Sequence, residues 1–149
     1  MLPVTSSSLR LFLHLLAASV WVGGQLTLVA VVPVLRTAGR EHLRAVARRF
    51  QQVAWPAFAL AVVTGIWGLL EVSLPDRSGA YLATLAVKLG CVTLSGTAAA
   101  VHVLVTAPRV RAATSEPQRR RAAAASGVAE ATSTCFALAA MLLGVVLRG

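Results

Sequence analysis

Long apolar stretches alternate with short polar segments along the chain. Four of the apolar stretches cover residues about 9–35, 50–72, 80–107 and 122–147. A helix that crosses a bilayer needs roughly 20 predominantly apolar residues, and each of these stretches is long enough. The pattern therefore predicts an all-α fold: an integral membrane four-helix bundle, antiparallel and up-down, that forms a single domain over residues 1–149.

Proline and glycine mark the expected helix ends. Pro33 and Gly39 are expected to close the first helix and Pro108 the third, because proline removes a hydrogen-bond donor from a helix interior. Residues 40–49 place apolar side chains on one face and arginines on the other, so we expect an interfacial helix or an extension of the second span. The segment Ser115-Glu116-Pro117 is a typical helix start.

The first apolar stretch has a second interpretation as a cleaved signal peptide. Small residues at 17–19 resemble a cleavage site. The apolar run continues to Pro33, however, which is longer than the apolar region of a signal peptide. A retained membrane span is the favoured interpretation.

The composition agrees with a membrane protein. Apolar residues make up 57% of the chain and charged residues only 13%, whereas a soluble domain usually carries about 25% charged residues. The mean hydropathy is +0.76. An ordinary soluble enzyme is therefore not expected.

The few charges are strongly unbalanced. The chain has 14 Lys and Arg against 5 Asp and Glu, a formal net charge of +9. Most of this excess lies in the two segments 36–49 and 109–121. Because arginine-rich loops stay in the cytoplasm, both segments should be cytoplasmic and both termini outside, in a multi-pass plasma (inner) membrane protein. The positive charge then orients the chain, and no nucleic-acid partner is expected.

Ionisable side chains inside a membrane span are costly and are functional candidates by default. Four such residues occur here: His14, Lys88, His102 and Glu130.

His14 lies near the start of the first span. At about 100° per residue, Trp21 and Gln25 share its helix face, and the alanines beside it leave room for a flat or bulky ligand. The alternative is an interfacial histidine that is hydrated near the outer surface.

Lys88 should lie within roughly 6 Å of the depth of His14, because the first and third spans run in the same direction. It could pair with a haem propionate or an anionic substrate. The alternative is a lysine that extends to the outer interface.

His102 lies 14 residues beyond Lys88, or roughly 21 Å along the helix, so it cannot share a metal with His14. It could instead be a hydrogen-bonded histidine near a helix end. Glu130 could be its partner or serve a proton path.

Met141 should lie close to the depth of His14. Histidine with methionine is an axial pair for haem or part of a Cu(I) site, although a packed methionine is the plainer interpretation. Cys91 and Cys135 fall inside spans and are expected to be buried free thiols. The chain has no G-x-x-x-x-G-K, C-x-x-C, G-x-S-x-G or H-E-x-x-H motif, which removes the support for nucleotide enzymes and hydrolases.

Three segments resemble a known family. The run from His14 through Trp21 to Gly24 resembles the first-helix motif of the copper-resistance protein D (CopD) family and of its relatives, the HemJ-type protoporphyrinogen oxidases. Trp55-Pro56 followed by Gly65-Ile-Trp67, and the segment from Tyr81 to Lys88, are similar to the second and third helices of that group. The resemblance covers roughly residues 9–105 and implies a helical membrane protein that handles haem or copper, with His14 as haem ligand and Lys88 as its partner.

Three functions follow as hypotheses. The first is a protein that binds b-type haem in the outer half of the bundle, for membrane electron transfer or as a haem-dependent oxidoreductase acting on a small substrate. The second is copper transport or copper resistance, and the third is a non-catalytic subunit of a larger membrane complex. The lipid bilayer, a membrane redox partner and a second copy of the chain are the partners considered. The candidate catalytic residues are Lys88 and Glu130; the candidate cofactor-binding residues are His14, Trp21, Gln25, Lys88 and Met141; the candidate metal ligands are His14, Met141 and His102.

Overall fold

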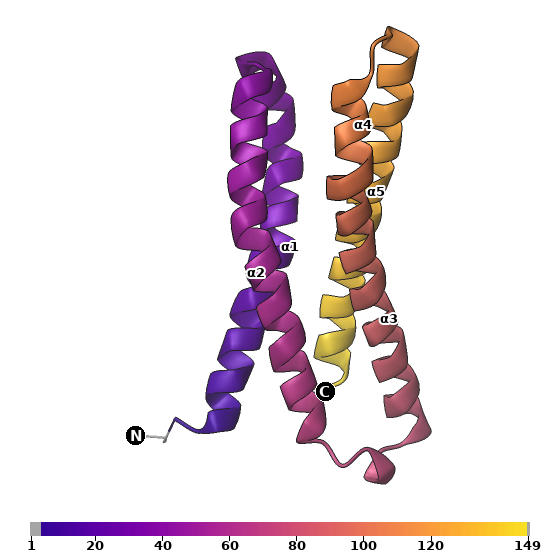
Figure 1. Ribbon diagram of the computed structural model, residues 1–149. Coiled ribbons are helices and arrows are strands. Elements are labelled where there is room, and N and C mark those ends of the chain that lie inside the picture. Colours follow the sequence, from indigo (N-terminus) through magenta and orange to yellow (C-terminus); the bar gives the residue numbers. More distant parts are fainter. Residues whose placement is uncertain (1–3, 149) are drawn as a thin grey trace. The chain divides into compact units, whose positions relative to one another are not determined.

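The computed structural model describes residues 4–148, with Arg36 and Arg40 described by their backbone alone, and this part of the chain is helical without a strand. Four of its helices are long and apolar enough to cross a membrane: Ser6–Leu35, Glu41–Leu70, Gly79–Ala112 and Glu116–Val146. The prediction of an all-α chain with four such helices is confirmed. The chain divides into two compact units, Met1–Asp76 and Arg77–Gly149, each with two long helices side by side (Figure 1).

The first unit is a helical hairpin of α1 (Ser6–Ala38) and α2 (Arg40–Leu70). The Thr5 hydroxyl caps α1 by accepting a hydrogen bond from the Ser8 backbone N–H at 3.1 Å. Gly39 joins the helices with a φ of 112°, a conformation that favours glycine because it has no β-carbon. A one-residue connection therefore reverses the chain.

The middle of this hairpin is held by aromatic side chains. Trp21 of α1 packs on Phe58 and Trp55 of α2, with ring centroids 4.5 Å and 5.7 Å away. Ala17, one turn before Trp21, and Ala54, directly before Trp55, are also buried, and their small side chains let α1 and α2 approach. Such ring pairs contribute about 0.5–1.5 kcal/mol beyond their buried area.

Two expectations for this unit are resolved by the continuity of the helices. Pro33 does not end α1, which runs on to Ala38, so that prediction is wrong. Proline removes one backbone hydrogen bond, and α1 continues through the bonds that remain. Residues 40–49 belong to α2 without a break, so they extend the second span rather than form a separate interfacial helix.

The second unit begins after a 3₁₀ turn, η1 (Leu74–Asp76). It contains α3 (Gly79–Val101), the π-helix η2 (His102–Thr106), α4 (Ala107–Ala112) and α5 (Glu116–Val146). The Ser78 hydroxyl caps α3 by accepting from the Tyr81 N–H at 3.2 Å. As predicted, α5 starts after Ser115 with Pro117 in its first turn.

Pro108 does not stop the third helix, so that prediction is also wrong. The chain passes from α3 through η2 into α4 and ends its helical path at Ala112. In the π turn the Ala107 N–H bonds to the His102 carbonyl, five residues back. We attribute the continuity to this wider turn, which gives the proline ring space over the preceding carbonyls.

Small residues form the contact between α3 and α5. Ser95 and Ser133 are 1% and 0% exposed, and their hydroxyl oxygens lie 3.4 Å apart. Gly96, Ala99, Ala137 and Ala140 are buried as well. Small side chains let the two helix backbones approach closely.

Replacing Ser133 with leucine is expected to destabilise the protein, because the added side chain has no space beside Ser95. Overpacking of this kind costs about 1–3 kcal/mol. Thermal unfolding in detergent measures the effect. The control is Ala131→Leu, which adds an apolar side chain at an exposed position of the same helix; equal unfolding temperatures for the two variants would contradict the expectation.

Candidate functional site

His14 of α1 lies against three residues of α2, Ala61, Thr64 and Gly65, which together are called its seat. Its Nδ1 atom lies 2.9 Å from the Ala61 carbonyl oxygen and 3.0 Å from the Thr64 hydroxyl oxygen. A carbonyl oxygen can only accept a hydrogen bond, so Nδ1 carries the proton. In the neutral ring the lone pair is then on Nε2, the tautomer that binds a metal through Nε2.

Thr64 and Gly65 complete this seat. The Thr64 hydroxyl donates to the Leu60 carbonyl at 2.6 Å, which leaves its oxygen as an acceptor for His14. A β-carbon at Gly65 would lie 3.3 Å from the His14 Cε1 atom, tighter than ordinary contact. One turn of α2 therefore fixes both the position and the tautomer of the imidazole.

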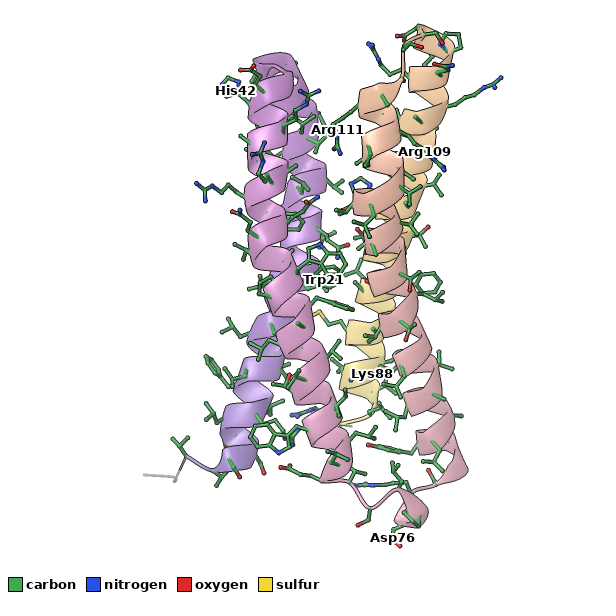
Figure 2. The ribbon with its side chains drawn as sticks, viewed as in Figure 1. Trp21, His42, Asp76, Lys88, Arg109 and Arg111 are labelled. Atoms are coloured by element: carbon green, nitrogen blue, oxygen red, sulfur yellow. The ribbon has the colours of Figure 1, made fainter. Side chains whose placement is uncertain are left out.

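Trp21 and Gln25 lie two and three turns beyond His14 on α1, and both are buried. Their shared face with His14 follows from the helical period, as predicted. Trp21 lies midway along α1 in Figure 2 and packs in the aromatic cluster with Trp55 and Phe58. Trp21 is therefore packed inside the hairpin, about 10 Å along α1 from His14.

An ion pair lies beside the His14 seat. Arg10, one turn before His14, forms a salt bridge with Glu71 at 3.1 Å and lies against Gly68. Its side chain is about four-fifths buried, so the pair is partly shielded from solvent. This pair could not be predicted from the sequence, because Glu71 falls at the end of the predicted span and its partner is 61 residues away in the chain.

Lys88 lies over a glycine of α5 (Figure 2). Its Nζ atom is 3.0 Å from the position that a β-carbon at Gly144 would take. Gly144 is in the last turn of α5, where free backbone carbonyls give a partial negative charge that favours a cation. Met141 precedes this glycine by three residues and is exposed, so Lys88 and Met141 lie at the same end of the second unit.

His102 and Glu130 form a separate pair in the second unit. His102 Nδ1 donates to the Ser126 carbonyl at 3.1 Å, and its Nε2 lies 3.7 Å from a Glu130 carboxylate oxygen. The sequence left open whether Glu130 is the partner of His102 or serves a proton path, and the contact agrees with the first of these. His102 also begins the π-helix, an element that is frequent at functional sites.

The structure does not bring His102 and Met141 together. Met141 lies 15 residues beyond Ser126, the contact of His102 on α5, or about 22 Å along that helix. Over residues 4–148 no three His, Cys, Asp or Glu side chains group as they would around a metal ion.

The two thiols differ in their surroundings. Both cysteines are free, but Cys91 is buried and Cys135 is exposed. The prediction that both thiols are buried is therefore wrong for Cys135. It lies two residues after Ser133, about 200° round α5, and so on the side that faces away from Ser95.

The His102–Glu130 pair is expected to contribute to stability. Replacing His102 with alanine removes the imidazole from beside a partly buried carboxylate, at a cost of about 1 kcal/mol. A double-mutant cycle with Glu130→Ala, read by thermal unfolding in detergent, should give a coupling energy of about 0.5–1.5 kcal/mol. Strictly additive effects of the two replacements would show that the pair contributes nothing.

Comparison with protein-family models, curated proteins and solved structures gives no match for this chain. The resemblance to the CopD and HemJ-type group therefore stays a prediction from the quoted motifs. The geometry around His14 is what the functional argument depends on.

Proposed function

We propose that the chain is a multi-pass membrane protein with four up-down spans, both termini outside and residues 36–49 and 109–121 in the cytoplasm. Large apolar side chains on the long helices support this proposal because they are exposed. Val63 of α2, Leu104 of η2 and Leu142 of α5 are among them. A water-soluble surface rarely carries so many, whereas a lipid-facing surface requires them.

Within this membrane protein we propose that His14 is an axial ligand of a b-type haem. The observation that carries the proposal is the pair of contacts from Nδ1 to the Ala61 carbonyl and the Thr64 hydroxyl. Histidines that bind metals usually donate their other N–H to such an acceptor, which fixes the ring and raises its basicity. The donor set fits haem, since an imidazole nitrogen is a protein ligand that holds haem iron.

Lys88 is proposed as the cation that pairs with a haem propionate or an anionic substrate. Gly144 supports this role, because the absence of a side chain there leaves space for the Lys88 Nζ atom between the apolar helices α3 and α5. A lysine held inside a span is costly and is typical of a ligand or substrate partner. Met141, exposed near this end of α5, stays a candidate second ligand.

Haem, when bound, would supply one-electron chemistry for membrane electron transfer or for oxidation of a small substrate. Within the first unit, His14 would hold it through Nε2, and Trp21 and Gln25 are the further residues of that unit proposed to contact it. Glu130, paired with His102, is proposed to store or pass a proton. A redox partner in the membrane, a larger complex or a second copy of the chain would accept the electron.

The test is an absorption spectrum with metal analysis on protein purified after expression with adequate haem. A Soret band and iron in proportion to protein are the expected result. Copper without a Soret band would replace the proposal with copper handling. The absence of both iron and copper would favour a non-catalytic subunit. The mass of the gently solubilised particle then separates a lone chain from a complex.

A further inference from the structure

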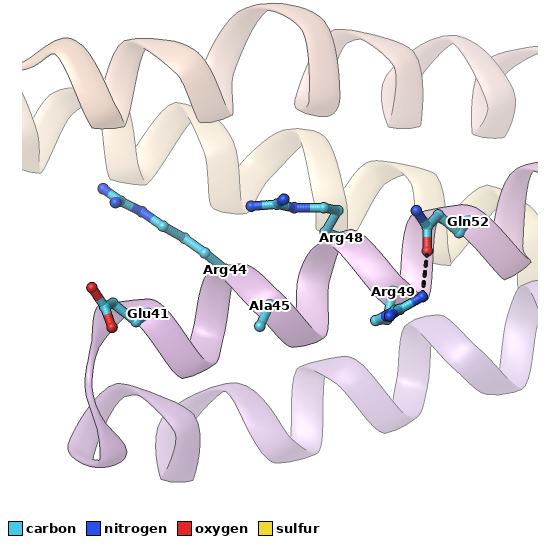
Figure 3. Close-up of a pocket in the computed structure, with 6 residues that line it drawn as sticks. All are labelled: Glu41, Arg44, Ala45, Arg48, Arg49 and Gln52. Atoms are coloured by element: carbon cyan, nitrogen blue, oxygen red, sulfur yellow. Dashed lines mark hydrogen bonds between the residues drawn. The ribbon is translucent and has the colours of Figure 1, made fainter.

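Six side chains from the first turns of α2 surround a shallow hollow of about 600 Å³ (Figure 3). The lining residues are Glu41, Arg44, Ala45, Arg48, Arg49 and Gln52. At about 100° per residue they fall within an arc about 140° wide on one face of the helix. Ala45 lies inside this arc, and its small side chain leaves space between the longer ones.

The hollow is strongly positive. It contains three arginines and a single carboxylate, that of Glu41. Between residues 4 and 148, the salt bridges involve none of these three arginines. Arg49 makes only a long contact, 3.4 Å, with the neutral Gln52 side chain. The guanidinium groups therefore keep donors that a phosphate could accept from.

The second arginine-rich segment differs in this respect. Arg119 and Arg120 both pair with Glu116, at 4.0 Å and 3.1 Å. The single carboxylate of Glu116 thus offsets part of their charge within α5. In the first segment, three arginines without a salt bridge among the described residues line one hollow, whereas in the second segment two arginines share one carboxylate.

The hollow lies just before the uncharged part of α2, where the headgroup layer of a membrane would be. Residues 53–70 of α2 contain no charged side chain. Arg48 and Arg49 precede Val53 by four or five residues, or about 6–8 Å along the helix. The headgroup layer of a bilayer is about 5–8 Å thick on each side. In a membrane whose apolar region begins at Val53, both arginines reach the lipid phosphates.

We propose that this hollow binds the phosphate group of an anionic phospholipid of the cytoplasmic leaflet. Arg48 and Arg49 donate hydrogen bonds to the phosphate oxygens, Arg44 adds positive charge, and Ala45 makes room for the headgroup. The proposal rests on the proposed membrane insertion and is independent of haem.

The test uses native mass spectrometry of the detergent-solubilised chain with phosphatidylglycerol and, separately, phosphatidylcholine. Arg48→Gln/Arg49→Gln is expected to weaken phosphatidylglycerol binding by about thirtyfold, since each arginine at a membrane surface contributes about fivefold. The matched control is Arg119→Gln/Arg120→Gln, which removes the same charge from two adjacent residues and should change binding less than threefold. Ala45→Leu, which keeps all charges, should weaken binding several-fold by filling the hollow.

Equal losses in the two arginine variants would overturn the site in favour of the overall charge of the chain. Equal binding of phosphatidylcholine and phosphatidylglycerol by the unchanged protein would overturn it as well. Competition by millimolar inorganic phosphate would contradict the lipid and point to a soluble phosphate. Recovery of the chain in alkali-washed membranes tests membrane insertion, and the Soret band tests haem binding. Both are measured on the same preparations, so that failure of the proposed function is distinguished from failure of the lipid site.

Discussion

Replacement of His14 with alanine is expected to lower the haem content per chain by at least about tenfold. The Nε2 lone pair is the proposed bond to iron, and alanine has no ligand atom to replace it. The measurement is the Soret absorbance relative to protein. Added imidazole should restore part of the band, because the truncated side chain leaves a space beside Ala61 and Thr64.

Two further variants separate ligation from folding. His42→Ala removes an exposed histidine near the start of α2 and should leave the Soret band unchanged. Thr64→Val keeps the Ala61 carbonyl but removes one acceptor of the Nδ1 proton, which should make the imidazole less basic and raise the haem midpoint potential. A full Soret band in His14→Ala would remove His14 from the site.

The sequence predicts the four apolar helices because lipid imposes a simple requirement on them. About 20 apolar residues are needed, and the spans are visible from composition alone. The helix ends are less accessible. Residues 40–49 of α2 are rich in arginine yet helical, so α2 begins ten residues before the predicted span. Composition reports where lipid could lie, whereas hydrogen bonding decides where a helix stops.

Pro33 and Pro108 show why local rules fail at these ends. Both prolines are placed inside continuous helical paths. The rule that proline ends a helix rests on the loss of one backbone donor, and here the helices continue through the bonds that remain. The π turn ahead of Pro108 is a cooperative adjustment over several residues, and no single residue of the sequence encodes it.

The candidate site likewise has residues that the sequence identifies and partners that it does not. His14 and Lys88 are identifiable because charge and polarity inside a span are unusual. Their partners are not, because Ala61, Thr64 and Gly144 are ordinary residues of apolar helices. Which of them meets an ionisable side chain depends on the register and rotation of two helices. Pairing of distant segments is a property of the fold, and one sequence does not contain it in readable form.

Replacement of Gly65 with valine is expected to lower the haem content about tenfold without removing the ligand. A β-carbon at Gly65 would already lie 3.3 Å from His14 Cε1, and the two methyl groups of valine add bulk at the same place. The ring must then move away from the Ala61 carbonyl, which fixes its tautomer. Loss of that bond alone weakens metal binding by about 10–100-fold in comparable sites.

The matched control is Gly23→Val on α1, where a β-carbon would meet no atom within 4 Å. Both changes place the same β-branched residue in a helix, so their effects on helix propensity are equal. Circular dichroism and unfolding temperature should therefore agree, while the Soret band falls in Gly65→Val alone. A parallel loss in both variants would mean that a valine in this hairpin disturbs folding in general. An intact band in Gly65→Val would show that the imidazole binds iron without the α2 seat, because the seat is the feature that this substitution removes.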